Sequence, residues 1–146
     1  MTEDERFMAI ALEEARRALA EGNRPFGAAV VRDGRVVARG RNLIESESDP
    51  TAHAELVAVR NACRALDTLS LEGATLYTTC EPCLMCTAAI LWAKIPRVVI
   101  GAAWADAPTS FDKQKLAFFD VLGQGKYQFE YEVGVMREEC VKLYGG

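Results

Sequence analysis

Histidine is almost absent from this sequence, since the 146 residues include only one, His53. The chain also has no uninterrupted apolar run of membrane-spanning length, and its first residues are acidic where a secretory leader would be basic. Basic residues are in deficit, with 17 Lys and Arg against 21 Asp and Glu and a formal net charge of −4. We therefore expect a cytoplasmic protein with no membrane partner, and one that does not mainly neutralise nucleic-acid phosphates.

Length and composition are typical of one globular domain over residues 1–146. Half of the residues are apolar and 26% are charged, which is enough for a core of useful size. No internal repeat or low-complexity segment interrupts the chain. Its five cysteines should be reduced in the cytosol, so a C-x-x-C pair indicates a metal or redox site rather than a disulfide.

Apolar periodicity and turn signals predict ten elements. Thr2 and Glu5 form a capping-box pattern that begins a helix, and Asp33-Gly34 between two β-branched runs predicts a hairpin. The expected elements are a helix from Thr2 to Gly22, strands at 28–32 and 35–40, a helix at 53–66, a strand at 74–79, a helix at 81–95, a strand at 97–103, a helix at 111–122, a strand at 128–135 and a helix at 136–144.

From the third strand onward, strands alternate with helices, which predicts parallel neighbours with helices on both faces of the sheet. The segment at 42–51 is polar and rich in turn residues, so it is expected to be a loop. The fold class is therefore α/β, a three-layer α/β/α sandwich around a mixed five-stranded sheet.

Two of the expected helices begin with side chains that can bind a metal. One begins at His53 and the other at Cys83, and Cys83 and Cys86 share a helical face because they are three positions apart. Two sulfurs and one nitrogen favour Zn²⁺. Three protein ligands leave one position open, as a catalytic zinc site requires, and Glu55 is then the candidate catalytic acid and base.

Two other interpretations of the same residues remain. Cys80 could complete a closed structural site with three sulfurs and one nitrogen, or the C-x-x-C pair could be redox-active. Cys80 ends a strand before the Glu81-Pro82 turn, so we expect it to point away from the other ligands. A closed site would also leave Glu55 without a role.

The pair of segments His53-Ala54-Glu55 and Pro82-Cys83-Leu84-Met85-Cys86 resembles the H-x-E and P-C-x-x-C signature of the zinc-dependent base deaminases. The resemblance to this cytidine/deoxycytidylate deaminase superfamily extends over positions 25–28, 49–55, 76–83 and 97–99. It is strongest toward small bacterial guanine/cytosine deaminases and tRNA adenosine deaminases. It implies a sheet of the cytidine-deaminase type whose last two strands are parallel, with the helix at 111–122 between them.

The same resemblance implies roles in substrate binding. Asn42 would hydrogen-bond the base, Phe26 would stack on it, and the backbone of Gly27 and Ala28 would approach it. Trp92, like Trp104, would close the pocket or lie in a dimer interface, and Asp112 resembles an acid of the guanine deaminases. From the residues alone, Asn42 could equally close a turn, and lone aromatics usually belong to the core.

The expected reaction is hydrolytic deamination of a free nucleobase, guanine, cytosine or a related triazine, with release of ammonia. The acidic balance and the C-terminal MREECVKLYGG favour this substrate, because the tRNA enzymes tend to end in a basic helix. The alternative is a tRNA adenosine deaminase acting at the anticodon wobble position, which needs a basic surface. A structural zinc module is a third hypothesis. The resemblance implies a homodimer whose contact includes the helix around 83–94.

Overall fold

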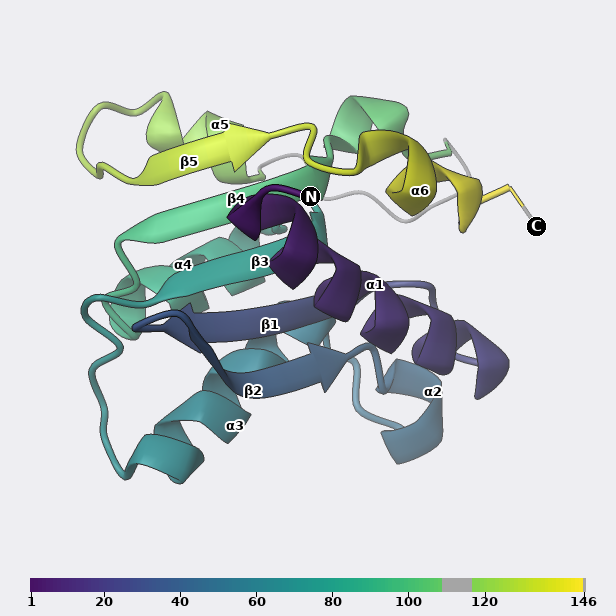
Figure 1. Ribbon diagram of the computed structural model, residues 1–146, viewed down its shortest axis with the longest axis horizontal. Helices are drawn as coiled ribbons and strands as arrows, with labels where there is room; N and C mark the ends of the chain where they lie inside the picture. The colour runs from purple at the N-terminus through teal and green to yellow at the C-terminus, as the bar shows by residue number, and fades with distance from the viewer. Residues whose placement is uncertain (109–116, 146) are drawn as a thin grey trace.

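A five-stranded sheet forms the centre of the computed structural model, which describes residues 1–108 and 117–145. The strands are β1 (Gly27–Arg32), β2 (Arg35–Arg41), β3 (Thr75–Cys80), β4 (Arg97–Ala102) and β5 (Glu130–Val133). The helices are α1 (Glu3–Ala20), α2 (Ile44–Glu47), α3 (Ala54–Leu66), α4 (Leu84–Trp92), α5 (Phe118–Leu122) and α6 (Arg137–Lys142), with a short 3₁₀ turn at Trp104–Asp106. Helices α1 and α6 cover one face of the sheet, and α3 and α4 cover the other (Figure 1). This arrangement confirms the predicted three-layer sandwich.

The strands lie in the order β2-β1-β3-β4-β5. Strand β1 is antiparallel to β2 and β3, whereas β3, β4 and β5 are parallel, so the sheet is mixed and its last two strands are parallel as predicted. The carboxyl ends of β3 and β4 therefore meet at one edge, where Cys80 pairs with Ala102. Ligands of α/β folds bind outside this kind of edge.

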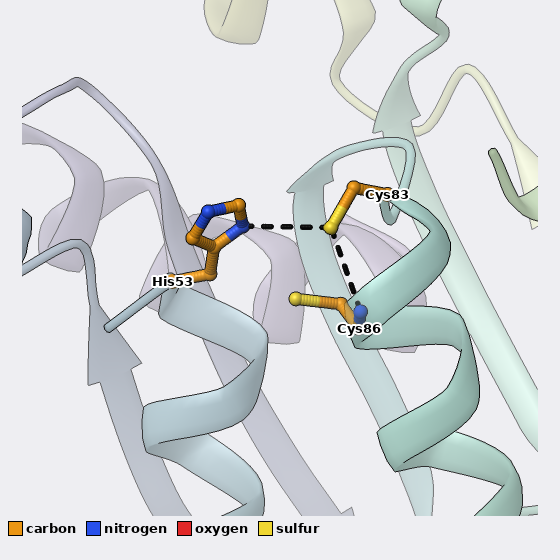
Figure 2. Close-up of side chains that lie close together, drawn as sticks. All are labelled: His53, Cys83 and Cys86. Atoms are coloured by element: carbon orange, nitrogen blue, oxygen red, sulfur yellow. Dashed lines mark hydrogen bonds between the residues drawn. The ribbon is translucent and has the colours of Figure 1, made fainter. Parts of the chain in front are cut away.

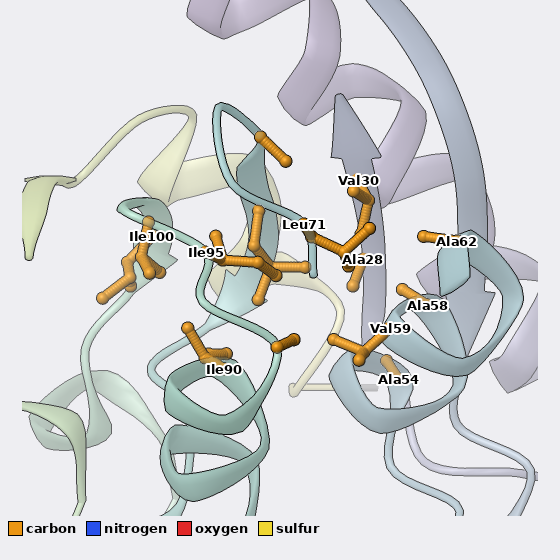
Figure 3. Packing of buried hydrophobic residues seen from close by; sticks show 14 of the residues in the cluster. Ala28, Val30, Ala54, Ala58, Val59, Ala62, Leu71, Ile90, Ile95 and Ile100 are labelled. Atoms are coloured by element: carbon orange, nitrogen blue, oxygen red, sulfur yellow. The ribbon is translucent and has the colours of Figure 1, made fainter. Parts of the chain in front are cut away.

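Side chains of each strand alternate between the two faces of the sheet. Ala28 and Val30 contribute to the core beneath α3 and α4, part of which Figure 3 shows. Val31, Tyr77 and Val99 contribute to the second core, beneath α1 and α6. Because helices cover both faces of the sheet, successive apolar residues of one strand are buried on opposite sides. Among the described residues, no helix has the length and apolar character needed to cross a membrane.

The segment after β2 contains α2 where the sequence predicted a loop. The buried side chain of Asn23 caps this helix, because its Oδ1 accepts the backbone N–H groups of Glu45 and Ser46, each at 3.0 Å. Asn23 follows α1, far from α2 in the sequence, so local pattern could not reveal the cap. Ser48 ends the helix in the left-handed conformation, with φ of 51°.

The predicted helix at 111–122 is described only from residue 117 onward, where α5 occupies Phe118–Leu122. Positions 109–116, and with them Asp112, lie outside the described residues.

Gly27 allows α1 to lie directly against β1. A Cβ at this position would overlap the backbone of Ala11 and Ala15 in α1. We expect Gly27→Ala to lower the free energy of unfolding by about 3 kcal/mol, since the helix must move away from the sheet. Thermal unfolding followed by circular dichroism measures this loss. The matched control is Gly145→Ala, where a Cβ has nothing within 4 Å, and equal melting temperatures for the two variants would contradict the packing argument.

Candidate active site

Helices α3 and α4 begin side by side, and each presents a candidate ligand at its N-terminus. His53 is the N-cap of α3 and Cys83 is the N-cap of α4, and both have an extended backbone. The cap position explains how His53 and Glu55 reach the same place. Residues two apart do not face each other on a regular helix, but His53 lies just outside the helix and Glu55 within its first turn.

His53, Cys83 and Cys86 come together as the sequence predicted (Figure 2). The Nδ1 atom of His53 lies 3.6 Å from the Sγ atom of Cys83, and the three donor atoms all lie within 4.8 Å of one another. Two sulfurs and one imidazole nitrogen are the chemistry that zinc prefers. In the described part of the chain, no donor atom of Cys80 or Glu55 joins this group.

The protonation of the three donors is coupled. The Cys86 side chain hydrogen-bonds the Cys83 sulfur, and this contact is the largest of the influences that lower the pKa of Cys83 to about 4. The same contact raises the pKa of Cys86, and the bond to Cys83 raises the pKa of His53. The N-terminus of α4 further favours a negative sulfur. Without a metal, the negative charge of the cluster therefore lies on the Cys83 sulfur while Cys86 keeps its proton, and a metal ion that binds all three donors must displace that proton.

Glu55 lies beside this cluster and is 6% exposed. Burial is the largest influence on its carboxyl group, and it raises the pKa to about 7, with the charge of Cys83 acting in the same direction.

A cavity of about 290 Å³ opens next to the donor cluster. Its walls combine apolar, polar and charged side chains, as is usual for small-ligand sites. The lining residues are Arg24, Phe26, Asn42, Ile44, Pro50, His53, Ala54, Glu55, Cys80, Glu81, Cys83 and Trp104.

Three residues that the resemblance assigned to the substrate pocket, Asn42, Phe26 and Trp104, line this cavity. Asn42 is 2% exposed, and its backbone N–H donates to the Phe26 carbonyl at 3.1 Å. Its Oδ1 accepts the backbone N–H of Ile44 at 3.1 Å, so the side chain has a fixed position. The remaining side-chain donor group of Asn42 is its amide nitrogen.

Three other assigned residues do not line the cavity in the described structure. Gly27 and Ala28 are buried in β1, where the Gly27 N–H donates to Thr79 Oγ1 at 3.1 Å and Ala28 belongs to the core. Trp92 is 84% exposed and ends α4, at the opposite end of the helix from Cys83. The structure therefore separates Trp92 from the substrate cavity and leaves it on the surface.

Sequence reasoning missed several wall residues, among them Glu81. Cys80 lies outside the donor cluster as expected, although it also lines the cavity. It is held outside the donor cluster, where its thiol hydrogen-bonds Tyr144 and burial raises its pKa to about 12. Tyr144 also packs edge-on against Phe26, with 5.9 Å between ring centroids. The position of Glu81 directly before Pro82-Cys83 was a signal that could have marked it.

Residues 1–102 match the family described as the cytidine and deoxycytidylate deaminase zinc-binding region. The chain belongs to this deaminase family. It is accordingly a hydrolytic deaminase acting on a C–N bond, with zinc as its cofactor.

Individual relatives of this deaminase carry two kinds of name. The tRNA-specific adenosine deaminase of Bacillus subtilis (strain 168) is 40% identical over 145 residues, which are 96% of this chain and 85% of that protein. A structure from a study of A-to-I editing by tRNA:A34 deaminases at the wobble position is 38% identical, with a TM-score of 0.83 over 94% of this chain and 98% of that chain. The guanine deaminase of Nitrosomonas europaea is 28% identical, with a TM-score of 0.87 over 96% of this chain and 81% of that chain.

Proposed function

We propose that this deaminase acts on tRNA and converts adenosine to inosine at the anticodon wobble position. The observation that carries this proposal is the 40% identity to a tRNA-specific adenosine deaminase over 96% of the chain. The free-base substrate expected from the acidic composition has weaker support, since the guanine deaminase structure is 28% identical.

His53, Cys83 and Cys86 would hold the zinc ion, since their donor atoms are gathered in one place. Zinc bound there supplies a Lewis acid that activates water near neutral pH. Glu55 lies in the same cavity wall and carries the proton in this proposal. Its carboxylate accepts a proton from the attacking water and donates it to the ring nitrogen. It then transfers the proton of the newly added hydroxyl group to the amino nitrogen, which leaves as ammonia.

Asn42 and Phe26 would hold the base. The fixed Asn42 side chain directs its remaining amide donor to the edge of the ring, and Phe26 offers an aromatic face for stacking. A cavity of about 290 Å³ admits one base but no duplex, so the target nucleotide must be unpaired or turned out of the stack.

Transcribed tRNA tests the substrate directly. We expect the zinc-loaded protein to form inosine in a transcript with adenosine at the wobble position, detected by mass spectrometry of the digested nucleosides. A transcript with guanosine at that position is the matched control and should form no inosine. Absence of inosine together with ammonia release from a free base would contradict the proposal.

Free guanine is the second candidate substrate, and two observations favour it. The net charge of −4 is unusual for a protein that tracks phosphates, and the Nitrosomonas europaea guanine deaminase covers nearly the whole chain with a TM-score of 0.87. An ammonia-release assay with guanine, cytosine and adenine, run beside the assay of the tRNA transcript, distinguishes the two candidate substrates.

A homodimer formed through α4 is part of the same proposal. Leu84 and Trp92 are 42% and 84% exposed on this helix, whose residues are all apolar except the buried Thr87, and an exposed apolar patch of this kind marks a contact surface. We expect Trp92→Glu to convert the dimer to a monomer, as measured by light scattering after size exclusion. Leu69→Glu is the control, since Leu69 is 91% exposed outside α4. Equal masses for Trp92→Glu and the unmodified protein would exclude this interface.

A further inference from the structure

Glu81 is the second carboxylate in the cavity wall, and its contacts differ from those of Glu55. It follows the last residue of β3, is 6% exposed, and its backbone N–H donates to the Ala102 carbonyl at 2.8 Å. Its Oε1 accepts the backbone N–H of Trp104 at 3.1 Å, and its Oε2 accepts the backbone N–H of Phe119 at 3.4 Å. One side chain thus joins two segments, one after β4 and one in α5.

The turn that contains Glu81 makes further contacts with the second of these segments. The Pro82 carbonyl accepts the backbone N–H of Phe118 at 3.0 Å, and Cys83 forms a β-bridge with Ala117. The same turn therefore carries a metal donor and anchors the start of α5.

Both carboxylate oxygens of Glu81 accept backbone N–H groups, an arrangement that holds an acceptor in place. Because both oxygens of Glu81 are engaged in this way, we assign it no part in proton transfer, which needs a carboxylate oxygen facing the substrate. Trp104, the residue that Oε1 holds, lines the cavity.

We propose that Glu81 is a positioning residue whose carboxylate holds Trp104 in the substrate-cavity wall and joins that wall to the turn bearing Cys83. Glutamine at this position offers one acceptor oxygen and an NH₂ group, which opposes a backbone N–H. Alanine removes both acceptors and leaves two N–H groups without their partner. Trp104 then loses its fixed position, and substrate binding weakens more than the chemical step does.

Fluorescence of Trp104 tests the proposal without any substrate. The sequence has two tryptophans, so Trp92→Phe leaves Trp104 as the only one. In this background we expect Glu81→Gln and Glu81→Ala to shift the emission to longer wavelength and to increase quenching by acrylamide, with zinc content unchanged. The matched control is Glu14→Gln, a buried carboxylate of α1 that contacts Arg17 and Arg41 and should leave Trp104 emission unchanged.

Steady-state kinetics provide a second readout, which rests on the proposed deaminase function. We expect KM to rise about tenfold in Glu81→Gln, with a smaller change in kcat. Unchanged emission and quenching in both Glu81 variants would overturn the positioning role, whatever the activity. Glu81→Gln keeps the side-chain volume and decides the matter if Glu81→Ala does not fold. A failed substrate assay bears on the proposed function alone, since the fluorescence result needs no turnover.

Discussion

Glu55→Gln is expected to lower the rate of deamination by about 10²–10⁴-fold, the usual contribution of general acid–base catalysis. Glutamine keeps the shape of the side chain but cannot carry the proton. Zinc content should stay at the level of the unmodified protein, because Glu55 lies beside the donor cluster without joining it.

The measurement combines inosine or ammonia formation with metal analysis of the same sample. Glu47→Gln makes the same chemical change on an exposed residue of α2 and should retain full activity. Normal turnover in Glu55→Gln would disprove its role as proton carrier, and loss of zinc would instead identify Glu55 as a ligand.

Cys86→Ala is expected to abolish both zinc binding and activity. Cys86 is fully buried in the first turn of α4, so no solvent-exposed group can readily replace its sulfur. The loss of zinc affinity should exceed the roughly 10–100-fold that follows loss of an outer-shell partner. Metal analysis after dialysis against a weak chelator measures this loss.

Cys63→Ala is the control, because Cys63 lies on α3 outside the donor cluster. It should bind one zinc ion per chain and remain active. Stoichiometric zinc in Cys86→Ala would contradict the assignment and would direct attention to Cys80 as a substitute ligand.

The sequence predicted those parts of the fold that depend on residues close together in the chain, such as turns and the alternation of strands and helices. Asp33-Gly34 predicted the hairpin because a tight turn needs positive φ, and the two residues have φ of 54° and 72°. The alternation of strands and helices predicted the parallel strands. Helix α2 could not be predicted, because the Asn23 side chain that caps it comes from another part of the chain.

The donor cluster was predictable because its spacing is local. Cys83 and Cys86 share one turn of helix, and His53 begins the neighbouring helix. Glu81 was missed because its partners, Trp104 and Phe119, are brought to it only by the fold. The substrate-binding role expected for Trp92 has no support in the structure, because Trp92 ends α4 whereas Cys83 begins it at the cavity.

Net charge is a weak criterion for choosing between the two candidate substrates. It averages the whole surface, whereas binding of a phosphate depends on the field near the site. The exposed side chain of Arg24 lies at the cavity even though the chain as a whole is acidic. The relatives named as tRNA deaminases therefore outweigh the composition in the proposed function.

Cobalt(II) in place of zinc gives the most direct test of a three-donor site that leaves one position for solvent and substrate. The visible spectrum should show two sulfur ligands, should change when a purine base is added, and should be unaffected by Cys80→Ala. A spectrum that is indifferent to added base and altered by Cys80→Ala would identify a closed site of three cysteines and one histidine, and would contradict the account of this protein as a deaminase.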